Sequence, residues 1–240
     1  MSKNKNHFLD HPEVKRHFES VFPIIIEESD RGAVLIAASQ VDLFLEKALK
    51  EIAPKNISKK RLKSIFDFSG PLGTFSSRID MAYFFRIINK DVFLAIHILR
   101  DLRNDVAHKP EIFSLSDHQN RISNLYKLGP GIPDGVHQWA IEGVMQTTVN
   151  KSLELKDPSS TENKPIFSEA KEVIEYISQK PNIMKILEDK LPKWKLGLGT
   201  ALICGIIFYG SDNAYSVLGD HSTFNNINSK KNKDKSNSKT

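Results

Sequence analysis

Residues 29–53 read SDRGAVLIAASQVDLFLEKALKEIA, and this stretch decides the fold. Its apolar side chains recur in steps of three and four residues, which places them on one face of an α-helix. Ser29 or Asp30 can cap the start of this helix, and Pro54 follows its end. The predicted buried stripe consists of Val34, Leu35, Ala38, Val41, Leu45 and Leu49. The stretch therefore predicts an amphipathic helix that packs against other helices.

The segments that follow show the same helical spacing. The predicted helices run from Ser58 to Phe66, from about Phe75 to Ile87, from Asn89 or Asp91 to the residue before Pro110, and from Ser114 or Ser116 to about Leu128. No convincing alternation of apolar and polar residues of the strand type occurs in the sequence. Residues 29–128 are therefore predicted to form an all-α helical bundle.

The rest of the chain is predicted to flank this bundle. Residues 1–28 form an N-terminal extension whose helix stops or bends at Pro23, because proline removes a helix hydrogen bond. Residues 129–191 form a helical extension interrupted by a polar linker, KDPSSTENKPIF, at residues 156–167. Residues 220–240 are expected to form a disordered basic tail.

Residues 192–219 contain the most apolar segment of the chain. Residues 196–210, LGLGTALICGIIFYG, carry no charged side chain. A helix that is apolar all round must be buried somewhere. One interpretation is a membrane anchor through residues 196–218, with Trp194 and Tyr209 at the interfaces, although a span usually needs about 20 apolar residues. The other is a helix buried in the protein core or in an oligomer interface, and both stay open at this point.

Charge and composition limit the classes of function. The net charge is +5, but residues 229–240 contribute +4 through five lysines and one aspartate, so the remainder is nearly neutral. Nucleic-acid binding by the folded part is therefore weakly supported. The single cysteine, Cys204, excludes an intrachain disulfide and a cysteine zinc cage. The start of the chain lacks the apolar stretch of a secretory signal, so we expect a cytoplasmic protein unless residues 196–218 anchor it.

One group of polar residues could carry chemistry. The segment ILRDLRNDVAHKPE, residues 98–111, places Arg103, Asn104 and His108 at the end of a helix. Asn104 and His108 are four residues apart and share a face, so the amide could orient the imidazole. Histidine can transfer protons near neutral pH, and arginine can stabilise the negative charge of a phosphorane. Metal-independent RNA cleavage needs both of these functions.

The same residues also have a structural interpretation. Arg103 and His108 are five residues apart, which is roughly 140° around a helix. One straight helix therefore cannot direct both at one substrate, and a shared site would need a homodimer or a distorted last turn. The alternative is that Arg103 pairs with nearby carboxylates while Asn104 and His108 fill a polar gap between helices.

A second candidate is the turn that begins at residue 69. Gly70, Pro71 and Gly73, together with Arg78, could contact a ligand. The alternative is that the turn only sets the angle at which the next helix starts, because glycine and proline have conformational reasons to be there. The histidines are scattered without ligand spacing, so we expect no bound metal and no cofactor.

Three stretches resemble the mannitol operon repressor family. They are RGAVLIAASQVDLFLEKALKEI at residues 31–52, FDFSGPLGTFSSRIDMAYFFRII at residues 66–88 and ILRDLRNDVAHKPEIFSLSD at residues 98–117, with residues 70–79 the most specific. The resemblance implies an all-α regulator that works through partner proteins instead of reading base edges, with a role in carbohydrate-operon control. After residue 130, the apolar segment and the lysine tail depart from the usual plan of the family.

The run from Arg103 to His108 resembles a second family. It is similar to the Arg-x4–6-His motif of the higher-eukaryote and prokaryote nucleotide-binding (HEPN) superfamily, whose helical domains include ribonuclease toxins and phage-defence nucleases. This resemblance implies that Arg103 and His108 form a catalytic pair, with Asn104 as the polar residue beside the arginine.

The sequence thus predicts a non-enzymatic helical regulator of the mannitol-repressor type, which controls transcription through a protein partner. The alternative is a metal-independent ribonuclease that cleaves RNA with Arg103 and His108 in a homodimer. A third hypothesis is that residues 196–218 tether either kind of protein to a membrane.

Overall fold

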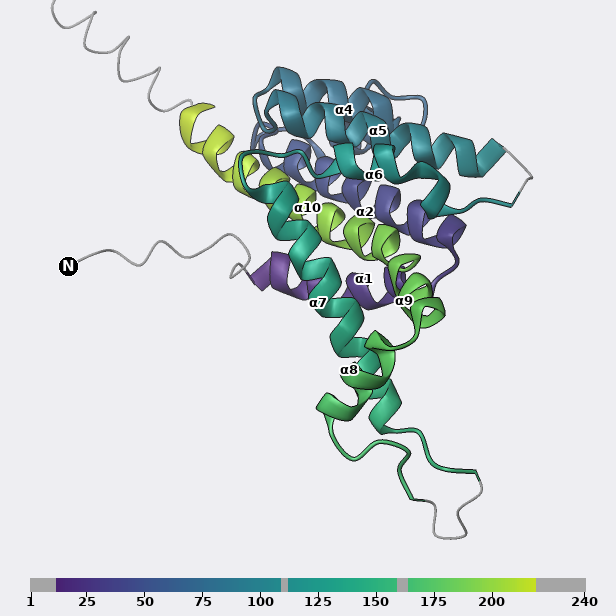
Figure 1. Ribbon diagram of the computed structural model, residues 1–240. Coiled ribbons are helices and arrows are strands. Elements are labelled where there is room, and N and C mark those ends of the chain that lie inside the picture. Colours follow the sequence, from purple (N-terminus) through teal and green to yellow (C-terminus); the bar gives the residue numbers. More distant parts are fainter. Residues whose placement is uncertain (1–11, 109–111, 159–163, 219–240) are drawn as a thin grey trace, which may run out of the picture.

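The computed structural model describes residues 12–108, 112–158 and 164–218, and these form an all-α bundle, as predicted (Figure 1). The predicted basic tail, residues 220–240, lies outside the described residues. The helices are α1 (Pro12–Glu27), α2 (Asp30–Glu51), α3 (Lys59–Phe66), α4 (Phe75–Phe84), α5 (Lys90–His108), the 3₁₀ helix η2 (Leu115–His118), α6 (Gln119–Leu125), α7 (Ile132–Leu153), α8 (Ala170–Ser178), α9 (Pro181–Glu188) and α10 (Leu191–Leu218).

Short polar side chains start several of these helices. The side chain of Ser29 accepts a hydrogen bond from the backbone N–H of Gly32 at the start of α2. Ser58 caps α3 in the same way, and Asn89 accepts from the N–H of Val92 in the first turn of α5. Each bond satisfies an N–H that has no partner within the helix. The predicted starts of these three helices are therefore confirmed.

The packing of α10 along α2 organises the bundle. Near its start, Lys193 contacts Asp30 at the beginning of α2, with 3.0 Å between Nζ and Oδ1. Near its other end, the Ser211 hydroxyl donates to Glu51 at the end of α2, over 3.1 Å. The two helices are therefore parallel and in contact over most of the length of α2. In Figure 1, α10 crosses the middle of the bundle, with α4 and α5 above it and α8 below.

Helices α1, α6 and α7 enclose the remaining sides of α10. The apolar side chains of its central segment belong to the same core as those of α2 and α5. The fully buried large side chains of α10 are Leu196, Ile203 and Ile207. The helical stretch Pro181–Ser211, which includes most of α10, is long and apolar enough to cross a membrane, but 67% of its apolar 18-residue window is buried inside the bundle.

Three details of the predicted helices are wrong. The helix predicted to run from about Phe75 to Ile87 ends at Phe84. Of the two predicted outcomes at Pro23, a stop or a bend, the stop is wrong, because helix α1 continues through Pro23 to Glu27. Its buried side chains Phe22 and Ile25 pack into the core, so tertiary contacts compensate for the hydrogen bond that proline removes. On α2, Leu35 is exposed, whereas Ala33 and Ala37 are fully buried. The buried face is wider toward the small residues than the predicted stripe, because α1, α4, α5 and α10 all pack on α2.

A smaller apolar cluster joins α7, α8 and α9. It contains Val144, Val149, Val173, Ile177 and Leu187. Trp194 of α10 packs against this cluster and against the main core, so it connects the two. The segment between α7 and α8 carries an isolated antiparallel bridge from Lys156 to Pro165, within the region predicted as a polar linker.

Glycine permits a close backbone contact of α10. A Cβ placed on Gly210 would collide with the backbone carbonyl of Ile87, in the turn between α4 and α5. No side-chain rotation can relieve this collision, because the opposing atoms are backbone. Gly135 in the first turn of α7 is the opposite case, since a Cβ there would meet no atom within 4 Å.

These two glycines provide a matched test of the packing. In a helix interior, alanine is favoured over glycine by about 1 kcal/mol, but an extra methyl group in a packed contact costs about 1–3 kcal/mol. We expect Gly210→Ala to lower the free energy of unfolding by about 1 kcal/mol, and Gly135→Ala to raise it by about 0.5–1 kcal/mol. Urea unfolding followed by circular dichroism measures both values. Equal stabilisation by the two substitutions would contradict the position of α10.

Candidate functional site

The predicted ligand turn is held closely against the end of α3. A Cβ on Gly70 would collide with the carbonyl oxygens of Ser64 and Ile65, and one on Gly73 with those of Asp67 and Phe68. Both glycines are therefore required by the approach of two backbone segments. After the turn, Thr74 and Ser77 form a reciprocal capping box at the start of α4. This capping box was not predicted from the sequence.

Arg78 is buried beneath this turn. Its guanidinium contacts Asp42 and Glu46 of α2, with N–O distances of 2.8 and 2.9 Å, and its Nε donates to the carbonyl of Leu72 over 2.9 Å. The side chain is only 9% exposed. Arg78 therefore connects α2, α4 and the turn that contains Gly70, Pro71 and Gly73. The structure brings these four predicted residues together, with the charge of the arginine directed toward protein carboxylates.

Arg103, Asn104 and His108 lie near the end of α5. Arg103 and His108 are exposed, and Asn104 is half-buried. The Arg103 guanidinium donates to the Asn104 side-chain oxygen over 3.3 Å. Within residues 12–108, no hydrogen bond joins Asn104 to His108, so the predicted orientation of the imidazole by the amide is not present in a single chain.

The carboxylates beside Arg103 have other partners. Asp101 pairs with Arg100 over 3.0 Å, and Asp105 pairs with Arg121 of α6 over 2.5 Å. The exposed guanidinium of Arg103 thus remains accessible on the outer side of α5.

An aromatic surface lies at the turn between α4 and α5, and it was not predicted from the sequence. We define it as Tyr83, Phe84, Phe85 and Phe93. Phe84 is 75% exposed and contacts Phe85 edge to face, while the rings of Tyr83 and Phe93 lie 4.6 Å apart. The surface borders a shallow hollow of about 640 Å³, which is also lined by Asp80 and Arg86.

Two further features accompany the aromatic surface, one in the turn and one on α5 beside Phe93. Arg86 has a φ of +59°, a left-handed conformation that costs a side chain with a Cβ about 1–2 kcal/mol. Such residues concentrate at functional sites. Next to Phe93, burial lowers the pKa of His97, and the neighbouring Arg100 lowers it further, although Asp80 at 3.7 Å acts in the opposite direction. His97 is thereby favoured in its neutral form beside the aromatic surface.

Other chemistry has little support among the described residues. No group of three or more His, Cys, Asp or Glu residues in that part of the chain could hold a metal ion. Cys204 is fully buried in α10, and burial raises the pKa of its thiol, which disfavours the reactive thiolate.

Comparisons of the chain with protein-family models, with curated proteins and with solved structures found no match. The resemblances to mannitol operon repressors and to HEPN domains therefore remain hypotheses that rest on the quoted residues.

The two predicted arginines should respond differently to substitution. We expect Arg78→Ala to lower the free energy of unfolding by about 2–3 kcal/mol, because it leaves the half-buried Asp42 without its cation and Glu46 with Lys50 alone. Arg103→Ala should change it by less than about 0.5 kcal/mol, as is usual for an exposed side chain. Urea unfolding measures both free energies. An Arg78→Ala protein as stable as the wild type would show that the ion pairs of Arg78 do not support the fold.

Proposed function

We propose that this chain is a non-enzymatic helical regulator that controls transcription through a protein partner bound at the aromatic surface. The observation that carries the proposal is the exposure of Tyr83, Phe84 and Phe85 on one turn of the bundle. Exposed apolar patches on soluble domains often mark interaction sites, and aromatic residues and arginine are enriched in protein interfaces. The resemblance to mannitol operon repressors supplies the link to transcription.

The geometry of this surface suits an anchor for a partner. Phe84 projects its ring into solvent beside the hollow lined by Asp80 and Arg86. A partner that covers Phe84 would remove a large apolar area from water, while the two flanking charges could form polar contacts at the edge. Interfaces commonly combine a few such apolar anchors with a polar rim.

We further propose that the regulator is cytoplasmic and that α10 is a core helix. The burial of Leu196, Ile203 and Ile207 against other helices of the same chain supports this interpretation. A membrane-spanning α10 would have to give up its contacts with α1, α2, α6 and α7, which would expose the apolar faces of those helices to water.

The regulator hypothesis predicts a specific loss of gene control. In cells from which the gene has been deleted, the wild-type chain should restore the transcript levels of a defined set of genes. Phe84→Ser should fail to restore them, because it removes the apolar anchor. Phe68→Ser is the matched control, since Phe68 is 91% exposed but lies in the turn between α3 and α4. Sequencing of total RNA measures the effect, and full restoration by Phe84→Ser would contradict the proposal.

The alternative function is metal-independent RNA cleavage by a homodimer. The observation that favours it is the exposure of Arg103 and His108, with Asn104 bonded to the arginine, at the end of α5. A second copy of the chain could then supply His108 to the Arg103 of the first. In this mechanism the imidazole moves the proton and the guanidinium stabilises the charge on the phosphorane.

Substitutions at these residues separate the two functions. If the chain is a ribonuclease, His108→Ala should lower cleavage by about 10²–10⁴-fold, and Arg103→Lys should also impair it, because lysine lacks the planar fork that binds two phosphate oxygens. If the chain is a regulator, the wild type should cleave no RNA in buffers with or without metal ions. Melting temperatures of the same samples verify that the variants are folded. If the wild type cleaves RNA and a folded His108→Ala protein does not, the regulator proposal is overturned.

A further inference from the structure

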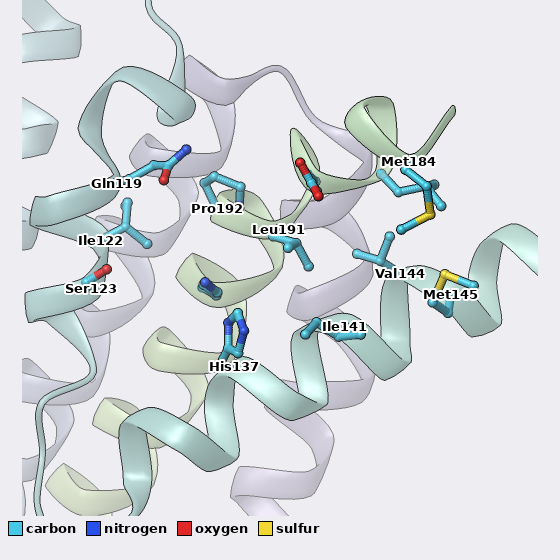
Figure 2. A pocket seen from close by; sticks show the side chains of 13 residues that line it. Gln119, Ile122, Ser123, His137, Ile141, Val144, Met145, Met184, Leu191 and Pro192 are labelled. Atoms are coloured by element: carbon cyan, nitrogen blue, oxygen red, sulfur yellow. The ribbon is translucent and has the colours of Figure 1, made fainter. Parts of the chain in front are cut away.

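A pocket of about 460 Å³ lies between α6, α7, α9 and α10, away from the residues of the aromatic surface (Figure 2). Its volume falls within the range of small-molecule sites, roughly 300–1,000 Å³. The residues that line it include Ser123, His137, Ile141, Met145, Met184 and Lys195. Neither the aromatic surface nor the residues of the predicted catalytic pair take part in it.

The pocket has a polar end and an apolar end. Figure 2 shows Ser123 and His137 on one side, and Met145 and Met184 on the opposite side, with Ile141 between them along α7. His137 and Met145 are eight residues apart on this helix, which corresponds to about 12 Å along its axis. An extended chain spans roughly 3.5 Å for every three consecutive bonds along it. The length of about 12 Å between His137 and Met145 therefore suits an aliphatic chain of about ten bonds. Methionine side chains adapt readily to such a chain.

Lys195 supplies a cation to the pocket from α10. Its side chain is half-buried, and desolvation by burial lowers its pKa. Among the described residues, no carboxylate lies within ion-pair distance of it. Lys193, two residues earlier, differs in that it binds Asp30 and the carbonyl of Glu28. A partly buried ammonium group without a counter-ion is unfavourable, and a bound anion would compensate for this cost.

The charge of the pocket also limits the kind of anion. Glu188 is exposed and lines the pocket as well, without pairing with Lys195. One cation and one carboxylate leave little net attraction for a doubly charged group such as a phosphate monoester. A singly charged headgroup, which can contact Lys195 directly while Glu188 remains in water, is better matched.

We propose that this pocket binds a small amphipathic monocarboxylate, with its headgroup at Lys195 and its aliphatic chain along Ile141 toward Met145 and Met184. The site goes beyond the proposed regulatory function, since it assigns the chain a small-molecule ligand at a place separate from the protein-binding surface.

Methionine methyl groups report directly on this pocket. The chain has four methionines, of which Met145 and Met184 line the pocket and Met81 lies on α4. In protein labelled with ¹³C at the methionine methyl groups, titration with decanoate should shift the Met145 and Met184 signals until they saturate. The Met81 signal should not move. Signals of Met145 and Met184 that stay unchanged, or a shift of Met81 equal to theirs, would overturn the proposal.

Substitutions test the role of the charge. Lys195→Gln should weaken decanoate binding at least tenfold and leave the binding of decanol, the neutral analogue, unchanged. Lys190→Gln is the matched control, because Lys190 is exposed and does not line the pocket. Equal decanoate affinity in the wild type and in Lys195→Gln would overturn the assignment of the headgroup.

A second variant tests the apolar part of the site. Ile141→Trp should obstruct the middle of the pocket and prevent the binding of both decanoate and decanol, while melting curves show that the variant is folded. Unchanged decanoate binding in folded Ile141→Trp would place the ligand elsewhere and overturn the proposal. This result would leave the regulatory function untouched, because the transcript measurement depends on Phe84 and not on the pocket.

Discussion

The packing of α10 along α2 is the contact on which the rest of the structure depends. The central part of α10 is apolar all round, so water cannot cover any of its sides without cost. Its large buried side chains are Leu196, Leu198, Leu202, Ile203 and Ile207. Burial of each is worth about 1.5–3 kcal/mol, so together they contribute roughly 8–15 kcal/mol, as much as the whole net stability of a typical domain. The same helix positions Lys195 in the pocket and Trp194 between the two apolar clusters.

The sequence predicted the helices of the bundle but not how they are arranged. Capping residues such as Ser29 and Ser58 are local signals, and the structure confirms the helix starts that they indicate. The predicted stop of the helix at Pro23 was wrong, because the packing of Phe22 and Ile25 outweighs a local preference. The burial of α10 inside the bundle could not be predicted, since an all-apolar helix can be buried in a membrane, in a core or in an interface. The main partner is α2, with which α10 is in contact over most of the length of α2.

The candidate sites differ in what the sequence could reveal. Both Arg78 and Arg103 were predicted as candidate site residues from the sequence. Only the fold shows that Arg78 faces Asp42 and Glu46 while Arg103 faces solvent. The aromatic surface was not predicted, because Phe84 and Phe85 have the composition of a core and their exposure depends on the turn at Arg86. The pocket was not predicted either, since its walls come from four helices distributed over residues 119–195.

The most direct test of the account is the unfolding of a chain that ends at Leu191 and therefore lacks nearly all of α10. If α10 is a core helix, this shortened chain should show no cooperative thermal unfolding transition and should bind a dye for exposed apolar surface, because α1, α2, α6 and α7 lose their common partner. A chain that ends at Leu218 controls for shortening in general. A cooperative transition in the chain ending at Leu191, close in temperature to that of the full-length protein, would contradict the central role of α10 and favour the membrane anchor.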